Sequence, residues 1–202
     1  DALYTAVSAL CVTGLSIVDT AAVFNPFGQA ILAVLIQVGG LGVSTMGAGV
    51  LLMLGRKVGI RQRNLIHDTM NLDSYSGVVR FLRTLFATTV FIEIIGAFLG
   101  YFVFRRDYEM MESIGLSIFH SISSFNNAGL TILTKERSME MYAEDPFMLI
   151  LTTALVFVGG LGFIVIRECW VNRFRWRKLS MHSRVSIFMA VFLLIGGAVL
   201  LS

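Results

Sequence analysis

Charged residues, prolines and cysteines are all scarce in this sequence. Only 14% of the 202 residues are charged, two are proline and two are cysteine, whereas 56% are apolar. This balance is far from that of soluble globular proteins. Because Cys11 lies in an apolar segment and Cys169 beside a basic one, the cysteines indicate neither a disulfide framework nor a zinc site. The apolar runs also lack a nucleophile paired with a base and any metal-ligand spacing, which argues against an enzyme.

Charge is missing from several runs long enough to cross a membrane. A hydrocarbon core about 30 Å thick takes roughly 20 helical residues to cross. Residues 27–54 and 146–166 contain no charged side chain, residues 84–104 contain only Glu93, and residues 185–202 are uncharged. These runs predict four membrane-spanning helices and a multi-pass protein of the cell membrane. Since the sequence opens at Asp1 without a basic segment or processing site, we expect an excerpt in which no run is a cleavable signal peptide.

Basic residues gather in two alternate connections between these runs. The twelve are Arg56, Lys57, Arg61, Arg63, Arg80, Arg83, Arg167, Arg173, Arg175, Arg177, Lys178 and Arg184, out of sixteen Lys and Arg residues. The positive-inside rule places both connections in the cytoplasm, and the acidic residues of the other segments suit the outer face. Basic tracts that abut apolar spans are expected to contact anionic lipid headgroups rather than nucleic acid.

An internal repeat organises the chain. Pro26-Phe27 and residues 38–42 match Pro146-Phe147 and residues 158–162 at an offset of 120, and eight positions of the two 17-residue windows are identical. Upstream, Ser8, Gly14, Leu15 and Ile17 match Ser123, Gly129, Leu130 and Ile132 at an offset of 115. Each copy therefore contains a short semi-polar helix, a glycine turn, a polar loop and a long apolar helix that begins near proline.

The topology predicts that the semi-polar segments are re-entrant pore loops. Both ends of residues 113–134 must lie on the outer face, and this stretch has too many polar side chains to face lipid. We therefore expect a first repeat at 1–54 that lacks its outer helix, a cytoplasmic linker at 55–83 and a complete second repeat at 84–166. A second linker at 167–184 and the start of a third outer helix at 185–202 follow.

The two glycine turns are the candidate ion-binding site. They contain Val12, Thr13, Gly14 and Leu15 in the first copy, and Asn127, Ala128, Gly129 and Leu130 in the second. Neither has a carboxylate, which argues against divalent selectivity, whereas backbone carbonyls alone can replace the hydration shell of a monovalent cation. Glycine allows successive carbonyls to turn toward an axis, and the preceding helix presents its negative end. The alternative is an ordinary tight turn, and Thr13 and the Asn126-Asn127 pair are expected to support the loops by hydrogen bonds.

Several motifs carry a resemblance to a known family. The segments Val12-Thr13-Gly14-Leu15, Phe125-Asn126-Asn127-Ala128-Gly129-Leu130, Leu179-Ser180-Met181-His182-Ser183 and the Gly-Gly-Leu-Gly runs are similar to those of the Ktr/Trk/HKT potassium-uptake family, most of all its bacterial Ktr membrane subunits. The resemblance implies four repeats in one polypeptide, whose four loops surround a pore. This chain would extend from the first filter to the third repeat's first helix, with filter glycines at Gly14 and Gly129.

The resemblance also implies substrate and partners. Potassium would be the transported ion, with possible sodium dependence and no covalent cofactor, and a cytosolic nucleotide-binding regulatory ring and a homodimer would be the protein partners. Two loops do not complete a fourfold ring, so further sequence or another chain must supply the others. A sodium-permeable or poorly selective cation pore, and a structural membrane subunit that conducts nothing alone, remain alternatives.

Three further features have two interpretations each. Glu93 is either an ion relay or a protonated or partnered structural group, and the outer-helix position favours the second. His120 is expected to pack or form hydrogen bonds rather than bind a metal, since no second ligand stands at helical spacing. The glycines of the first inner helix, Gly39, Gly40, Gly42, Gly47 and Gly49, are expected to allow close helix packing ahead of acting as a hinge.

Overall fold

The computed structural model describes residues 1–42, 45–47, 77–133, 139–172 and 175–201, and the regular structure within them is helical. The α-helices are α1 (Ala2–Leu10), α2 (Thr20–Val23), α3 (Pro26–Leu41), α6 (Gly77–Phe104), α7 (Met110–Phe125), α8 (Pro146–Gly160), α9 (Phe163–Val171) and α10 (Met181–Leu201). Two short 3-10 helices, η2 (Met139–Tyr142) and η3 (Trp176–Lys178), lie in the connections. The prediction of an all-helical chain is confirmed.

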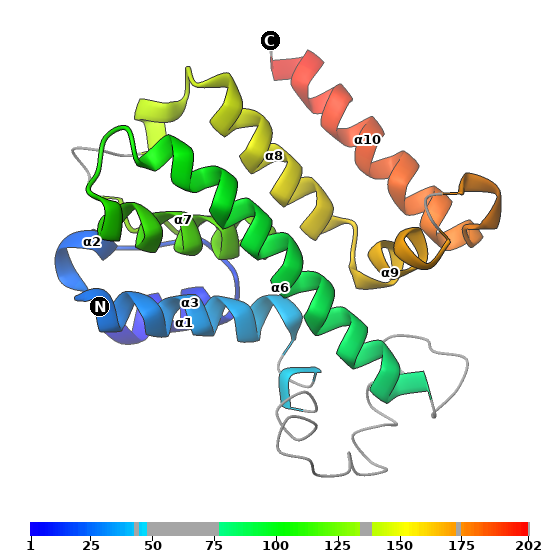
Figure 1. The fold of residues 1–202 in the computed structure, drawn as a ribbon, viewed down its shortest axis with the longest axis horizontal. Helices are drawn as coiled ribbons and strands as arrows, with labels where there is room; N and C mark the ends of the chain where they lie inside the picture. Colours follow the sequence, from blue (N-terminus) through cyan, green and yellow to red (C-terminus); the bar gives the residue numbers. More distant parts are fainter. Residues whose placement is uncertain (43–44, 48–76, 134–138, 173–174, 202) are drawn as a thin grey trace.

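The helices pack in two groups around α7. Figure 1 shows α6 and α8 side by side with α7 against them, while α1 and α3 lie together below. The second group contacts the first through α3 and α7, and the further views show α1 alongside α3. The last helix, α10, meets α9 near its own N-terminal end and otherwise stands apart (Figure 1).

Two of the described helices are long and apolar enough to cross a membrane alone. These are Phe81–Phe104 in α6 and Met181–Leu200 in α10, and α8 with the first part of α9 makes a third candidate only as a bent pair. Their apolar side chains are widely exposed, among them Ile94 and Phe98 at 62% and Phe188 at 64%. Four spans were predicted. The first of them, residues 27–54, lies partly outside the described residues, and α3 by itself is a shorter apolar helix.

Each inner helix, expected as one long apolar helix, is interrupted at Gly42 or Gly162. α3 ends at Leu41, and α8 ends at Gly160 before α9 begins at Phe163 at an angle of 99°. Both Gly42 and Gly162 have φ of +83°, a backbone conformation that residues with a Cβ rarely adopt. The apolar runs 27–54 and 146–166 are therefore continuous in hydropathy but not in helix.

The starts of these helices agree with the proline signal. Pro26 and Pro146 stand in the first helical turn, where a backbone N–H has no acceptor within the helix, so its absence in proline breaks no hydrogen bond. The preceding residue caps each helix: the Asn25 side chain accepts from the N–H of Gly28, and Asp145 accepts from the N–H groups of Phe147 and Met148.

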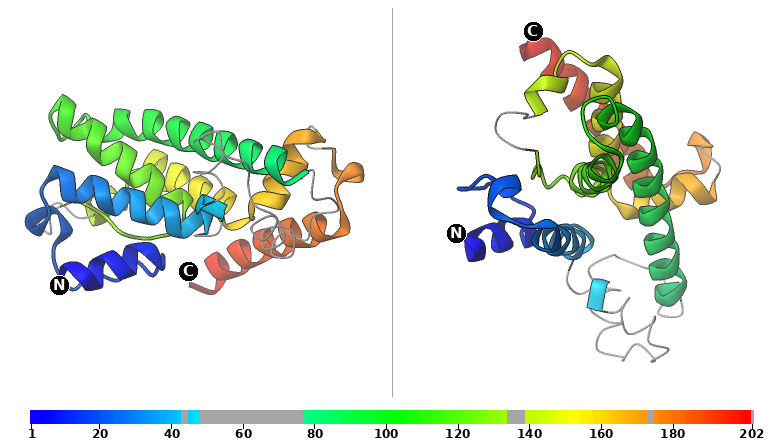
Figure 2. Two further views of the ribbon diagram at one scale, coloured as in Figure 1. Left: turned by 90° about the horizontal axis from the view of Figure 1, so that it is seen from below. Right: turned by 60° about the vertical axis from the view of Figure 1, so that its left-hand side comes forward.

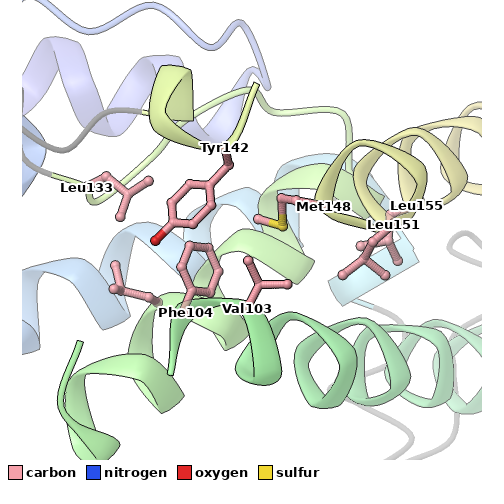
Figure 3. Packing of buried hydrophobic residues seen from close by; sticks show 8 residues of the cluster. Val103, Phe104, Leu133, Tyr142, Met148, Leu151 and Leu155 are labelled. Carbon is pink, nitrogen blue, oxygen red and sulfur yellow. The ribbon is translucent and has the colours of Figure 1, made fainter. Parts of the chain in front are cut away.

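A buried apolar cluster joins the C-terminal end of α6 to α7 and α8. Val103 and Phe104 from α6 meet Leu133, Tyr142 and three side chains of α8 (Figure 3), and Leu116 of α7 completes the cluster. The rings of Phe104 and Tyr142 meet edge to face at 5.4 Å between centroids. At the rim the Tyr142 hydroxyl donates to Asp107, and Arg106 pairs with Asp145 at 2.8 Å. These contacts fix the segment that carries the second glycine turn.

Candidate functional site

The two glycine turns have the same backbone geometry. In the first turn (residues 11–17) Val12 has φ +55° and Gly14 φ +73°, and in the second turn (residues 126–132) Asn127 has φ +57° and Gly129 φ +69°. Asparagine tolerates the left-handed region, but a β-branched valine there is a genuine outlier. The chain thus adopts a left-handed conformation at the same place twice, which is strained at Val12, and strained residues of this kind cluster at functional sites.

Matching hydrogen bonds end the helices that lead into the turns. The N–H of Cys11 donates to the carbonyl of Val7, and the N–H of Asn126 donates to that of Ile122. Two residues later, Thr13 N–H donates to Ser8 O at 3.0 Å and Ala128 N–H donates to Ser123 O at 2.8 Å. Each pair is related by the offset of 115 read from the sequence. Both α1 and α7 therefore end with their C-terminal carbonyls beside a glycine turn.

The structure brings the two turns into contact. A Cβ placed on Gly129 would lie 3.9 Å from the Cα of Gly14, and a Cβ placed on Gly14 would overlap the Ala128 carbonyl oxygen. Gly14 is thus required twice, for its φ and for this close approach. Among the predicted site residues Ala128 and Leu130 are buried, Val12 and Gly14 are half-buried, and Thr13, Leu15, Asn127 and Gly129 are exposed.

Side-chain hydrogen bonds hold each turn, as the sequence predicted for Thr13 and the asparagine pair. The hydroxyls of Ser8 and Thr13 lie 2.8 Å apart in the first turn, and the Ser123 hydroxyl donates to Leu130 O at 2.6 Å in the second. The Thr20 hydroxyl of α2 donates to the carbonyl of Thr131, which ties the first unit to the second turn. With its amide oriented to satisfy both groups, Asn127 bridges Val156 O and Gly160 N at 3.2 Å each.

Glycines let the inner helices lie directly on the ends of α1 and α7. A Cβ on Gly39 would be 2.8 Å from the carbonyl carbon of Leu10, and a Cβ on Gly159 would be 2.8 Å from that of Phe125. The packing role is confirmed for Gly39. Gly42 instead marks the helix break, no atom of the described residues lies within 4 Å of a Cβ placed on Gly47, and Gly49 lies outside the described residues.

Glu93 lies beside the second turn rather than far from it. Its carboxylate oxygen accepts from the Asn126 amide nitrogen at 3.1 Å, and the same nitrogen lies 3.1 Å from the Gln37 side-chain oxygen. Glu93 therefore has the kind of partner that the structural interpretation expects. Gln37 is not among the residues that the sequence pattern singled out. An amide side chain within a charge-free run does indicate that a hydrogen-bond partner is needed there.

His120 is held by hydroxyl groups. Its Nε2 lies 3.0 Å from the Thr152 hydroxyl and 3.3 Å from that of Ser124, and its ring meets Phe104 edge to face. The expected packing and hydrogen-bonding role is confirmed. Across the described part of the chain, no group of three or more His, Cys, Asp or Glu side chains is placed to hold a metal ion.

No charged side chain belongs to either turn, since residues 11–17 and 126–132 contain only apolar, hydroxyl, amide, thiol and glycine groups. Main-chain carbonyls and helix C-termini are therefore the available negative poles. Such groups suit a monovalent cation that sheds water and later leaves, because a ring of carboxylates would hold it more strongly.

Comparison with known proteins adds a family assignment. Residues 1–199 match the family described as TrkH, cation transport protein. The chain is 36% identical to Ktr system potassium uptake protein B of Bacillus subtilis over 187 residues, which is 93% of this chain and 41% of that protein. It is also 36% identical to potassium/sodium uptake protein NtpJ of Enterococcus hirae (99% of this chain, 44% of that protein) and to Ktr system potassium uptake protein B of Vibrio alginolyticus (99% and 44%). The chain therefore spans less than half the length of these curated relatives.

Proposed function

Because this chain belongs to the TrkH family of cation transport proteins, we propose that it forms part of a potassium-uptake pore in the cell membrane. It is a membrane protein with long apolar helices. The observation that carries the proposal is the pair of turns with equal left-handed geometry, in contact at Gly14 and Ala128.

In this proposal the chain contains two units of a repeated pore-loop fold. Residues 1–54 provide the first re-entrant helix, turn and inner helix, and residues 84–166 provide a complete outer helix, pore loop and inner helix. Residues 55–83 and 167–184 are cytoplasmic linkers, and residues 185–202 begin a third outer helix. The matched hydrogen bonds and the paired breaks at Gly42 and Gly162 support this division.

The transported ion would be held by main-chain oxygens. Carbonyls of residues 12–15 and 127–130 would replace the water around a potassium ion, while the C-terminal ends of α1 and α7 add negative potential. Potassium is here the substrate, not a resident cofactor. We do not expect an enzyme activity from this arrangement, since selection by carbonyls makes and breaks no covalent bond.

The complete pore would need two further turns and other components. Relatives more than twice as long leave room for two further repeats. A membrane subunit of a system named Ktr is expected to work with a cytosolic nucleotide-binding ring and to form a homodimer. A pore that also carries sodium is the second candidate, because one relative is named a potassium/sodium uptake protein.

Substitution of the turn glycines tests the proposal. The entire open reading frame that encodes this chain would be expressed in a cell that lacks potassium uptake, and growth would be measured at low potassium. We expect Gly14→Asp and Gly129→Asp to abolish rescue, because each adds a side chain at positive φ and an unmatched charge.

The matched control is Gly115→Asp. Gly115 lies on the exposed face of α7, and an added Cβ would have no atom of the described part of the chain within 4 Å. It introduces the same residue elsewhere on the pore-loop helix, and we expect it to retain growth. Equal rescue by wild type, Gly14→Asp and Gly129→Asp would overturn the assignment of the turns.

A further inference from the structure

A buried polar cluster connects three helices immediately before the second turn. Asn126 is the residue after α7, and its amide nitrogen lies 3.1 Å from Glu93 Oε1 on α6 and 3.1 Å from Gln37 Oε1 on α3. The same nitrogen donates to the carbonyl of Ile122 at 2.9 Å. Glu93 and Asn126 are each 8% exposed. We call Gln37, Glu93 and Asn126 the amide brace.

Burying the polar side chains of the brace in an apolar setting costs free energy, so we expect the brace to have a role that offsets this cost. Glu93 is the one charged residue of the apolar run 84–104, and burying a carboxyl group is unfavourable unless it is hydrogen-bonded. Among the described residues Glu93 forms no ion pair, and its carboxylate contacts amides. The Asn126 amide nitrogen contacts acceptors on α3 and α6, while the Asn126 side-chain oxygen is buried without a hydrogen-bond partner among the described residues. Contacts that join groups from several elements favour one relative arrangement of those elements.

A neighbouring glycine leaves space for the brace, and a neighbouring serine makes a hydrogen bond beside it. A Cβ on Gly40 would lie 2.5 Å from Cγ of Asn126, so the absent side chain leaves the space that the amide occupies. The Ser121 hydroxyl donates to the backbone carbonyl of Glu93 at 2.8 Å, which holds α7 and α6 in register at this level. The brace therefore links the inner helix of the first unit, the outer helix of the second unit and the second turn.

The first turn differs at the position of the amide. Cys11 occupies the position of Asn126 at the offset of 115, and it is exposed. Leu15 is 61% exposed, whereas its counterpart Leu130 is 5% exposed. The Ser8 and Thr13 hydroxyls make a local contact in the first turn, so the two turns share their positive-φ positions and differ in the side chains that hold them.

We propose that the amide brace positions the second turn and thereby sets how strongly the pore prefers potassium over sodium, an inference that rests on the proposed function. Asn126 directly precedes the left-handed Asn127, so a shift of Asn126 moves the carbonyls of residues 127–130 together. Selection between two monovalent ions depends on where those oxygens lie and how far they relax. Glu93, Gln37 and Asn126 act through the backbone and do not touch the ion.

The test measures potassium and sodium uptake by the full-length protein in the same cells, with membrane levels checked by immunoblot. Glu93→Met, Gln37→Met and Asn126→Leu remove the polar groups while keeping similar size. We expect each to lower the preference for potassium over sodium by roughly tenfold, the effect of losing one or two buried hydrogen bonds. We expect Glu93→Gln, which keeps an acceptor at the same place, to remain within about twofold of wild type.

The control is Thr89→Val. Thr89 is 1% exposed, lies one helical turn from Glu93 on α6, and its hydroxyl has no hydrogen-bond partner among the described residues. This substitution removes a buried polar group from the same helix without disturbing the brace, so the ion preference should stay unchanged. A changed preference in Thr89→Val would count against a specific role for the brace.

Each remaining outcome decides the matter. An unchanged ion preference in Glu93→Met and Gln37→Met at normal membrane levels would overturn the brace alone, while potassium uptake sensitive to Gly14→Asp and Gly129→Asp would keep the proposed function. Loss of preference in Glu93→Gln equal to that in Glu93→Met would assign the effect to charge instead of positioning. If Glu93→Met and Gln37→Met are both absent from the membrane while Thr89→Val is present, the brace is needed for folding and has no separate role in ion preference. No potassium uptake by wild type would overturn the proposed function, and the brace with it.

Discussion

Glycines meet two separate physical demands in this chain. Gly14, Gly42, Gly129 and Gly162 have φ between +69° and +83°, where a Cβ is unfavourable. Gly39 and Gly159 have no such φ but lie where a carbonyl group approaches too closely for a side chain. A glycine-to-alanine substitution is therefore unfavourable for a different reason at each set: backbone strain at the first and steric overlap at the second.

Gly39→Ala and Gly159→Ala are predicted to destabilise the protein through overpacking. The added methyl group would meet the backbone of Leu10 or Phe125, which cannot move aside as a flexible side chain can. We expect a loss of about 1–3 kcal/mol each. Thermal unfolding of the purified full-length protein in detergent measures the change as a lower midpoint.

Gly196→Ala on α10 is the control for this pair. No atom from the described ranges lies within 4 Å of a Cβ at Gly196, and alanine favours a helix over glycine by roughly 1 kcal/mol. We expect an unchanged or raised midpoint. Unfolding midpoints for Gly39→Ala and Gly159→Ala as high as that of Gly196→Ala would show that these contacts relax at no cost.

Sequence reasoning at the residue scale succeeded where a pattern repeats. The offset of 115 pairs Gly14 with Gly129, and both have positive φ, while their role in ion binding stays a prediction. Gln37 was missed because its counterpart in the second copy is Phe157, so the repeat gives no signal there. The bond between Asn126 and Gln37 joins residues far apart in sequence, which no local pattern encodes.

At the scale of helices, Asp145 serves two purposes at the start of α8. Its side chain accepts from the N–H groups of Phe147 and Met148, and its other oxygen pairs with Arg106, whose side chain is 63% exposed. A helix cap typically contributes about 1 kcal/mol, whereas an exposed ion pair contributes less. The cap should therefore dominate the effect of Asp145 on stability.

Asp145→Ala is predicted to lower stability by about 1–2 kcal/mol, and Asp145→Asn by a few tenths. Asparagine keeps an oxygen for the cap and loses only the charge. The two variants would be compared by thermal unfolding at low and high salt, with Arg106→Gln as the control that removes the ion pair alone. Equal losses for Asp145→Asn and Asp145→Ala would show that the ion pair, not the cap, holds this end of α8.

Helix existence was predictable from hydropathy, but helix continuity was not. Residues 27–54 and 146–166 are apolar throughout, so a summed hydropathy gives one helix in each place. The breaks at Gly42 and Gly162 depend on a single backbone angle, which leaves no trace in hydropathy. The repeated Gly-Leu-Gly sequence was the available clue, and we had interpreted it chiefly as close packing.

At the scale of the whole molecule, the apolar surface requires an environment that the described residues do not supply. The apolar window of α10 is only 6% buried and that of α6 only 28% buried. In a membrane protein such faces meet lipid or other protein surfaces. The sequence predicted that the two turns are equivalent, but their contact at Gly14 and Ala128 follows from packing of α3 on α7, which only the fold reveals.

Charge asymmetry predicts which ends of the helices face the cytoplasm. Glu144 lies exposed before α8, on the side assigned to the outer face, and Arg177 lies exposed before α10, on the side assigned to the cytoplasm. In a variant without Cys11 and Cys169, we expect Glu144→Cys in intact cells to react with a membrane-impermeant maleimide. We expect Arg177→Cys to react only after the cells are opened.

This experiment also constrains the pore loops. Arg105 lies in the connection between α6 and α7, and Glu144 lies between the second turn and α8. If Arg105→Cys reacts from outside like Glu144→Cys, the segment between them enters and leaves the membrane by the same face, as a re-entrant helix must. Reaction of Arg105→Cys and Glu144→Cys from opposite faces would make α7 a crossing helix. The two glycine turns would then point in opposite directions across the membrane, and carbonyls from both could not surround one ion.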